Sequence, residues 1–371
     1  MKSFKLRFTL IFTAIIFVVT NGTGLHSATM ARNEQMEEAE AAAVEMAESE
    51  ANNIKNLREV EKRYISTLSQ NDIFTDENAT LGDKILFCSS EASRTGYLYF
   101  AYADLTGKAT IYNGTGRTTD VATMDFFQKA KNGNVVGSDL LFMDEKPVLI
   151  YASPVYKNRT IVGVLYGARD GLELSETIKN SGYRETGYVY IINNEGTTVA
   201  HKNIDLVLAK DNIIENAKKD SSLQELAALI GTMTTGAKGS GTYEYQGVKK
   251  IAGFAPIEGE PWAVAVSIEA DEVVRSANEL RNTMVAASLG SAAVGAIITF
   301  IISTNIAKNV KKITHAAKQL GEGSLNVSLN VNRRDEIGQL AKALNTTIEQ
   351  IKDYRAYIDE LDRALNCIAD G

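Results

Sequence analysis

The sequence predicts an α+β protein in which two antiparallel-sheet units follow one another on a long helix, together with two transmembrane helices and a helical coiled-coil module. Three observations predict this fold. Two segments carry no charged residue and are long enough to cross a bilayer, residues 32–69 contain neither Pro nor Gly, and residues 80–268 hold short β-branched or aromatic runs separated by Gly and Asn. A chain of 371 residues also exceeds what one hydrophobic core usually organises.

Composition excludes several classes of function. The net charge of −7 offers no basic face, so no nucleic-acid partner is expected. Only 3 His and 2 Cys are present, too few for a Cys/His zinc module or a disulfide scaffold, and we expect no metal and no cofactor. His201 and His315 are isolated, and the sequence has no HExxH, GxSxG or Walker motif. We therefore expect no catalytic residues and no enzyme.

The two uncharged segments extend from Phe8 to Ala31 and from Asn282 to Ala307. Basic residues precede the first and follow the second, so both outer flanks are predicted to be cytoplasmic by the positive-inside rule. The expected location is the plasma membrane, in contact with lipid, with two spans and an extracytoplasmic sensor. The predicted division is a cytoplasmic N-terminus at 1–7, a first span at 8–28, a sensor at 29–283 and a second span at 284–303.

The first span has an alternative interpretation. Its solid apolar core is only about a dozen residues long, and small residues follow near Ser27 and Ala28, which also describes a secretory signal peptide. An uncleaved anchor is the preferred interpretation, and the signal peptide stays open.

A stalk helix is predicted over residues 31–70, because Ala, Glu, Met and Leu dominate and are strong helix formers. Its Glu residues are interpreted as a solvated face. The apolar residues recur at helical spacing and predict one packed stripe. They are Met36, Ala39, Ala43, Met46, Ile54, Leu57, Tyr64 and Leu68.

The segment that follows the stalk alternates predicted strands with short helices, in an order that favours two consecutive antiparallel units over βαβ repeats. Strands are predicted at Tyr97–Ala103, Ala109–Tyr112, Val148–Ala152, Ile161–Gly167, Tyr188–Asn193, Thr242–Gln246, Lys250–Phe254 and Trp262–Ile268. Helices are predicted at Thr123–Asn132, Asn212–Asp220 and Leu223–Met233.

Three sequence segments resemble the strand sequences of the double Cache sensor domain of bacterial transducers. They are YASPVYKNRTIVGVLYG, GYVYIINNEGTTVAHKN and GVKKIAGFAPIEGEPWAVAV. The resemblance covers residues 86–267. It implies two tandem PAS-like modules on the stalk, a membrane-distal one at 80–175 and a membrane-proximal one at 180–270. It also implies that a small ligand binds the distal module.

The ligand pattern of that family is only partly present. Thr123 and Met124 stand where the family often has an Asp-Arg pair, whose Arg grips a ligand carboxylate, and Ala168 stands at the position of an acid. A small polar organic ligand is therefore expected, with a free amino acid ranked lower and other metabolites open. Arg169, Arg117 and Arg94 are weighed as substitutes for the missing Arg. The predicted ligand-binding residues are Tyr112, Met124, Phe126, Phe127, Tyr151, Tyr166, Arg169 and Asp170.

Residues 304–356 resemble a HAMP linker, with two amphipathic helices around GEGSLNVSLNVNRRDEIG. Asn309 stands where that family frequently has Pro. The line of apolar a and d residues on the second helix continues beyond the module, so residues 357–371 are predicted to begin a cytoplasmic signalling helix. An a/d stripe this short needs a partner, which predicts a parallel homodimer through the HAMP and stalk helices. The stripe consists of Val310, Ile313, Ala317 and Leu320, then Ile337, Leu340, Leu344, Thr347, Ile351, Tyr354, Ile358, Leu361, Leu365 and Ile368.

Together these features resemble a methyl-accepting chemotaxis receptor that lacks its output part, or a natural short form. The expected function is transmembrane chemosensing, in which an extracellular ligand acts through HAMP on a cytoplasmic output. A chemotaxis kinase and coupling protein are partners only if a full-length output exists. The alternative is the sensor portion of a membrane histidine kinase or diguanylate cyclase without its catalytic domain, and a stand-alone regulator of full-length receptors is a weaker third possibility.

Overall fold

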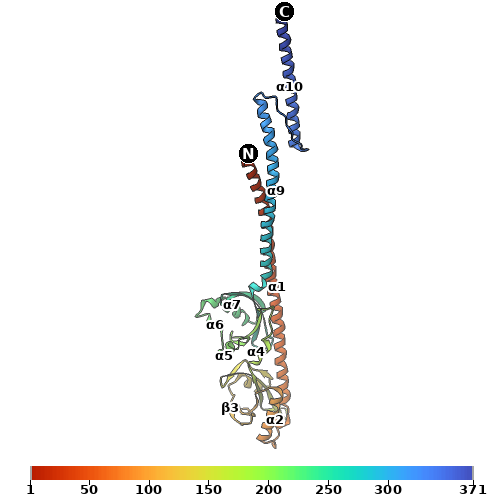
Figure 1. Ribbon diagram of the computed structural model, residues 1–371. Helices are drawn as coiled ribbons and strands as arrows, with labels where there is room; N and C mark the ends of the chain where they lie inside the picture. Colours follow the sequence, from red (N-terminus) through yellow and green to blue (C-terminus); the bar gives the residue numbers. More distant parts are fainter. Residues whose placement is uncertain (1, 370–371) are drawn as a thin grey trace. The chain divides into compact units, whose positions relative to one another are not determined.

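The computed structural model describes residues 2–369 and divides into two compact units (Figure 1). One unit is Ala31–Ser276, and the other joins the residues up to Met30 with those from Ala277 onwards. Helix α1 (Lys2–Leu68) and helix α9 (Arg275–Gly321) each run through the boundary between the units. The predicted α+β class with antiparallel sheets and a long helix is confirmed.

The first sheet has seven strands in the order β3-β2-β1-β7-β6-β4, with β5 paired to β6, and every pairing is antiparallel. Helix α2 precedes it, begins in a capping box between Thr80 and Asp83, and ends at Gly96 in a left-handed conformation. The elements are a 3₁₀ turn (Asp72–Phe74), α2 (Leu81–Thr95), β1 (Tyr99–Ala103), β2 (Lys108–Ile111), β3 (Thr118–Asp120), α3 (Asp125–Lys131), β4 (Val136–Gly137), β5 (Leu141–Met143), β6 (Lys146–Lys157) and β7 (Thr160–Asp170).

The second sheet has five antiparallel strands in the order β10-β11-β12-β8-β9. Short helices α4 to α7 connect the strands or cover the sheet, and α8 leads into α9. The elements are α4 (Glu173–Ile178), β8 (Tyr188–Asn193), β9 (Thr198–His201), α5 (Ile204–Leu208), α6 (Ile213–Asn216), a 3₁₀ turn (Ser221–Leu223), α7 (Gln224–Met233), β10 (Gly239–Tyr245), β11 (Val248–Pro256), β12 (Trp262–Glu269) and α8 (Ala270–Val273).

All eight predicted strands and three predicted helices of this segment are present. Strand β8 has the predicted ends, and each of the other elements has at least one shifted end. The sequence reading missed α2, α4, α5 and α8 and the short strands β3, β4, β5 and β9. Except for α2, these are brief elements whose apolar residues are too few to show a period. Helix α2 has 15 residues and begins at a Thr80–Asp83 capping box, so the sequence did carry a signal for it.

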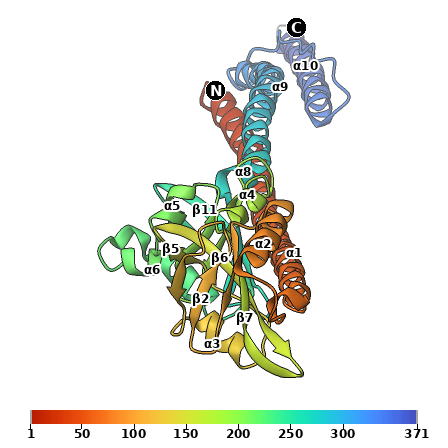
Figure 2. The ribbon, with the colours of Figure 1, turned by 90° about the horizontal axis from the view of Figure 1, so that it is seen from below.

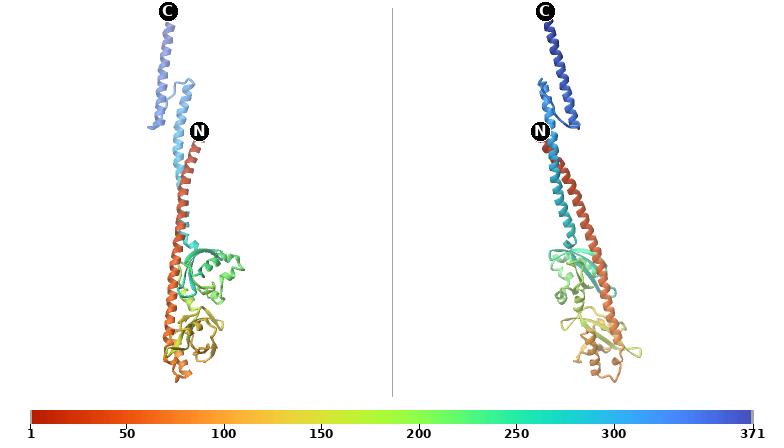
Figure 3. Two further views of the ribbon diagram at one scale, coloured as in Figure 1. Left: turned by 180° about the vertical axis from the view of Figure 1, so that it is seen from behind. Right: turned by 45° about the vertical axis from the view of Figure 1, so that its right-hand side comes forward.

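Helix α1 runs alongside both sheets and packs against one face of each (Figure 3). Its contact with the second sheet is made of alanines spaced four residues apart, Ala39, Ala43, Ala47 and Ala51, all buried. The opposing residue on β11 is Gly253, where a Cβ atom would overlap the backbone of Ala43 and Val44. Small residues on both sides therefore let helix and strand approach closely.

The predicted stripe on this helix is correct in part. Ala39, Ala43, Ile54 and Leu68 are buried, but Leu57 is 43% exposed, so its place in the stripe was wrong. The buried line passes through Ala47 and Arg58, each one residue beyond the predicted Met46 and Leu57.

Each sheet has a second face that looks away from α1. On the first sheet this face packs against α3, and we call it the α3 face. In Figure 2, α1 and α2 lie together beside the first sheet, and their side chains share one core with its opposite face. On the second sheet the equivalent face packs against α6 and α7.

The other unit contains the apolar helices. Helices α1 and α9 are the described helices long and apolar enough to cross a membrane, which supports a membrane location. The HAMP segment has a small core formed by Ile313 and Ala316 of α9, Leu329 of the connector and Ala341 of α10 (Glu336–Ala369). Ile368 and Cys367 have no described side chains, and residues 370–371 of the predicted signalling helix lie outside the described residues.

Replacing Gly253 tests the close contact between α1 and β11. Gly253→Ala should lower the free energy of unfolding by about 1–3 kcal/mol, because the added methyl must displace helix backbone. The matched control is Gly231→Ala in α7, where no heavy atom lies within 4 Å of the added Cβ. Fluorescence of Trp262, the 1 Trp of the chain, reports unfolding of the purified protein. Equal midpoints for the two variants would contradict the contact.

Candidate functional site

Four of the eight predicted ligand-binding residues come together at the α3 face, and a fifth, Met124, lies at the start of α3. Phe126 and Phe127 of α3 are buried against Tyr166 of β7, and the ring centroids of Phe126 and Tyr166 are 5.2 Å apart. Met124 caps the start of α3 and is partly exposed. Asp170 lies opposite Val148 in the β6–β7 register, and directly opposed residues share a face, so its carboxylate is on this side too. Its Oδ1 accepts a hydrogen bond from the N–H of Leu172.

The other three predicted residues lie on the opposite face of the sheet. Tyr151 and Tyr112 are buried in the core shared with α1 and α2. Arg169 alternates with Ala168 and Asp170 along β7 and therefore points toward α1. There it forms ion pairs with Glu61 (3.0 Å) and Glu173 (2.7 Å) and stacks on Tyr97. The structure does not bring these three residues to the α3 face.

The pairing of Arg169 corrects the interpretation of the stalk glutamates as a solvated face at Glu61, whereas Glu37, Glu38 and Glu45 are exposed as predicted. Glu61 accepts a hydrogen bond from the hydroxyl of Tyr97 (2.7 Å) as well as the ion pair with Arg169. Burial, followed by the hydrogen bond to Glu61, holds the pKa of Tyr97 far above its usual value, so this phenol remains a donor. Glu61 thus ties the stalk to the edge of the first sheet.

The remaining arginines differ in location. Arg94 pairs with Glu91 on the exposed side of α2. Arg117 pairs with Asp144 (3.5 Å), and both charges act on Tyr99, whose ring lies 6.5 Å from that of Tyr166. Burial raises the pKa of Tyr99, the charge of Asp144 raises it further, and Arg117 opposes this. Of the three arginines weighed from the sequence, Arg117 is the one that lies beside the α3 face.

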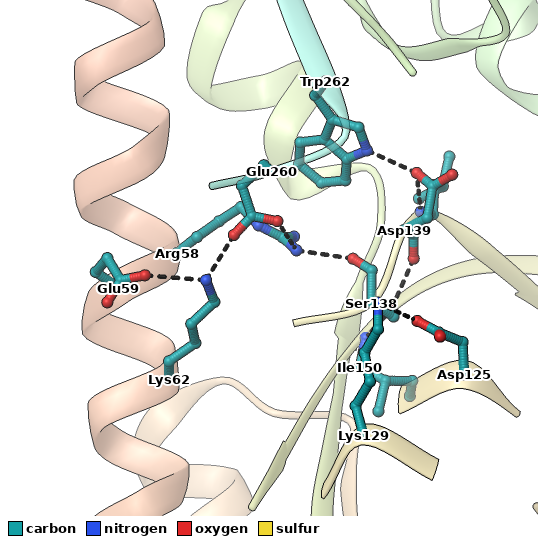
Figure 4. A network of polar contacts seen from close by, with 11 residues as sticks. Arg58, Glu59, Lys62, Asp125, Lys129, Ser138, Asp139, Ile150, Glu260 and Trp262 are labelled. Carbon is teal, nitrogen blue, oxygen red and sulfur yellow. Dashed lines mark hydrogen bonds and ion pairs between the residues drawn. The ribbon is translucent and has the colours of Figure 1, made fainter. Parts of the chain in front are cut away.

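A buried arginine on α1 connects the stalk to both sheets (Figure 4). Arg58 is 1% exposed, and its Nη2 donates to the carbonyl oxygen of Ser138, after β4, and to Oε2 of Glu260, between β11 and β12, both at 2.8 Å. The guanidinium carbon lies 4.1 Å from the ring centroid of Trp262. One side chain of the helix therefore contacts backbone of the first sheet and a carboxylate of the second. We call these four residues the Arg58 junction.

Asp139 adds a direct bridge between the sheets beside the Arg58 junction. Its Oδ1 accepts a hydrogen bond from the indole N–H of Trp262 (2.6 Å), and its Oδ2 accepts one from the side-chain amide of Asn193 (2.9 Å). On the other side of the junction, Lys62 donates to Oε1 of Glu260 (2.7 Å). Glu260 is thereby held by two cations of the same helix.

The Arg58 junction was not predicted from the sequence. Arg58 stands in a helix rich in Glu and Lys, where an isolated charge is normally solvated, and its partners lie far away in the sequence. The available signal was position: Arg58 follows Ile54 by four residues, on the line of the buried side chains.

An antiparallel sheet pair on a long helix, followed by an apolar helix and a HAMP segment, defines the sensory and linker part of a transmembrane transducer. A family model described as Cache domain matches residues 27–277, and a HAMP domain model matches residues 301–353. The first match covers more than half of the chain, so the chain belongs to the Cache domain family.

Relatives and solved structures agree with this assignment. The methyl-accepting chemotaxis protein McpG of Pseudomonas putida is 23% identical over 354 residues, which cover 93% of this chain and 53% of McpG. The chain thus spans about half the length of that relative. The ligand-binding domain of the Pseudomonas fluorescens chemoreceptor CtaA in complex with L-isoleucine aligns with a TM-score of 0.51 at 20% identity, covering 66% of this chain and 98% of that one. The sensory domain of the Campylobacter jejuni chemoreceptor Tlp3 aligns with a TM-score of 0.50 at 12% identity, covering 67% and 99%.

A comparison of two ion pairs between the same elements tests the Arg58 junction. Arg58→Met should lower the free energy of unfolding by about 3–5 kcal/mol, because it leaves Glu260 buried with less compensation. The control is Lys55→Met, which breaks the exposed pair between α1 and Glu258 and should cost about 1 kcal/mol or less. Denaturation followed by circular dichroism measures both.

The double variant Arg58→Met/Glu260→Leu should recover part of the loss, because it removes the uncompensated charge together with its partner. Strictly additive losses from Arg58→Met and Glu260→Leu would contradict direct coupling between these side chains.

Proposed function

We propose that the chain is the sensory and transmembrane part of a chemoreceptor that binds a small extracellular molecule and passes the signal through HAMP to a cytoplasmic output. The observation that carries this proposal is the order within one chain: a Cache domain at 27–277, an apolar helix, and a HAMP domain at 301–353. This order places a binding domain and a signalling linker on either side of a hydrophobic segment. The role is non-catalytic.

The topology follows from the charge pattern of the flanks. We propose an uncleaved first span at 8–28, a second span at 284–303, and an extracytoplasmic sensor at 29–283. Its membrane-distal PAS-like module is 80–175 and its membrane-proximal module is 180–270. HAMP occupies 304–356 and the start of a signalling helix occupies 357–371, on the cytoplasmic side of the plasma membrane.

The α3 face of the first sheet is the proposed ligand site. Phe126, Phe127 and Tyr166 supply apolar walls, Asp170 supplies a carboxylate for a cationic or donor group, and Arg117 is the adjacent cation. No arginine replaces Met124 at the start of α3, which is why a small polar organic molecule is preferred over a free amino acid. Free amino acids stay among the ligands to be tested, because the CtaA domain was solved in complex with L-isoleucine.

The Arg58 junction supplies a route from the sensor to the membrane. α1 is one uninterrupted helix from Lys2 to Leu68, so a displacement of either sheet against Arg58 acts on the helix that leads into the first span. A ligand shifts the equilibrium between two arrangements of the sheets only if it binds one arrangement more tightly than the other.

A parallel homodimer is the proposed state of the cytoplasmic part. Its a/d residues Leu340, Ile351, Ile358, Leu361 and Leu365 are exposed, between 38% and 58%, in the single chain. A row of exposed large apolar side chains on one helix is stabilised when a second copy covers it.

Titration of the purified 371-residue chain in lipid nanodiscs tests the ligand site, with amino acids, amines and small organic acids as probes. At least one probe should bind, and Asp170→Asn or Arg117→Ala should weaken that binding tenfold or more, since each removes a charge at the α3 face. Arg94→Ala is the control, because its ion pair with Glu91 lies on the other side. Tight amino-acid binding that is lost in Arg169→Ala and kept in Asp170→Asn would overturn the assignment.

Cysteine cross-linking in membranes tests the homodimer. In a Cys367→Ser background, Leu361→Cys at a d position should form an intermolecular disulfide, whereas Arg363→Cys at the outward f position should not. Cys88 does not interfere, because it is buried and burial raises the pKa of its thiol to about 12. Equal cross-linking at both positions, or none at Leu361, would contradict the seam.

A further inference from the structure

The second sheet carries a cavity of about 440 Å³ on its face opposite α1. Helices α5 to α7 cover this face, and the tyrosines of β8 and β10 form much of the wall. The volume is within the range of small-molecule sites. Its position on the second sheet corresponds to the α3 face of the first, since both faces look away from the stalk.

Two lysines converge at this cavity. The ammonium groups of Lys202 and Lys250 lie 4.1 Å and 5.1 Å from the ring centroid of Tyr188. Among residues 2–369, no carboxylate oxygen lies within 4.0 Å of either nitrogen, although other surface lysines such as Lys218 and Lys238 have such partners. Burial lowers the pKa of Lys250 and the nearby charge of Lys202 lowers it further, against the opposing effect of Glu269. Two neighbouring ammonium groups that have no carboxylate partner favour an anion between them.

A buried phenol gives a second, independent indication of a ligand. Tyr190 is 6% exposed, lines the cavity, and its hydroxyl has no hydrogen-bond partner within the described part of the chain. A buried hydroxyl without a partner is costly. Burial also holds its pKa well above the usual value, so it remains an O–H donor. A ligand acceptor in the cavity would satisfy it.

His201 completes the set of donors. Its Nδ1 accepts a hydrogen bond from the N–H of Asn203 (2.8 Å), and burial lowers its pKa to about 4. The ring is therefore neutral at physiological pH with its proton on Nε2, which makes it a donor. Its ring centroid lies 5.3 Å from that of Tyr188 and 6.2 Å from that of Tyr190.

The two acidic residues of the wall, Asp211 and Glu269, form no ion pair with Lys202 or Lys250 among the described residues. Asp211 accepts a hydrogen bond from the side-chain amide of Asn216 (2.8 Å), and Glu269 is the cross-strand neighbour of Lys250 without an ion pair to it. The apolar remainder of the wall, including Leu226 and Ile230, suits a hydrocarbon body.

We propose that this cavity is a second binding site and that it takes a small organic carboxylate. The carboxylate lies at Lys202 and Lys250, with Tyr190 and His201 as neutral donors, and the body of the ligand packs among the tyrosines. This site is separate from the one proposed on the first sheet and does not depend on it.

The test is calorimetric titration of the 371-residue chain in lipid nanodiscs with L-lactate, succinate and benzoate. Each acid is compared with its amide. At least one carboxylate should bind, its amide at least tenfold more weakly. Lys202→Met and Lys250→Met should each weaken binding tenfold or more, Tyr190→Phe several-fold, and Lys202→Arg should retain it.

Lys249→Met is the matched control, since Lys249 is the exposed neighbour of Lys250 on β11, and it should leave binding unchanged. Asp170→Asn should also leave it unchanged, which separates this cavity from the α3 face. Lys202 is exposed, so its replacement tests binding in a folded chain. Absence of binding by all three carboxylates, equal binding of acid and amide, or unchanged binding in Lys202→Met would overturn the proposal.

Discussion

Burial of the Arg58 guanidinium is the constraint on which the arrangement of the sensor depends. A charge that is 1% exposed needs partners, and those partners come from two different sheets: the carbonyl of Ser138 and the carboxylate of Glu260. Neither sheet alone supplies both partners of the guanidinium, so its burial is compensated only when both sheets pack against the helix. Gly137 shows how closely the first sheet fits, because a Cβ there would lie 2.6 Å from Nη2 of Arg58. The charge therefore specifies the relative position of helix and sheets more than it adds to stability.

The alanine contact complements this constraint. Between Ala39 and Ala51 the helix presents small side chains to the second sheet, and apolar contact is non-directional, so by itself it does not define a position along the helix axis or oppose a shift. The Arg58 junction and the pair of Glu61 with Arg169 are directional and do not tolerate it. Close apolar packing supplies the contact area, and the polar residues define the register.

The extent to which the sequence predicted the fold follows from the length of each pattern. Long uncharged segments, a helix without Pro or Gly and strands such as Tyr188–Asn193 are visible in a single sequence, because each depends on local periodicity. The site was less predictable. The alternation of a strand already separates Arg169 from Tyr166 and Asp170, but placing Tyr151 required the register of β6 against β7, which is a long-range property. The role of Arg58 depends on partners that are distant in the sequence. The role of Tyr190 depends on a hydroxyl that has no hydrogen-bond partner among the described residues. Both are properties of the folded chain.

The two faces opposite the stalk explain why a second binding cavity is compatible with one signalling helix. In each sheet the strands have one side on α1 and the other on short helices, so a molecule bound among the short helices pulls on strands whose opposite side contacts the stalk. The β11–β12 turn carries Glu260, and β11 carries Lys250 ten positions earlier, so the cavity and the Arg58 junction share a hairpin. The α3 face has a comparable link, since Ser138 donates its N–H to Ile150 in the middle of β6. A molecule at either proposed site would therefore act on the same guanidinium, through β6 and Ser138 from the first sheet and through the β11–β12 hairpin from the second.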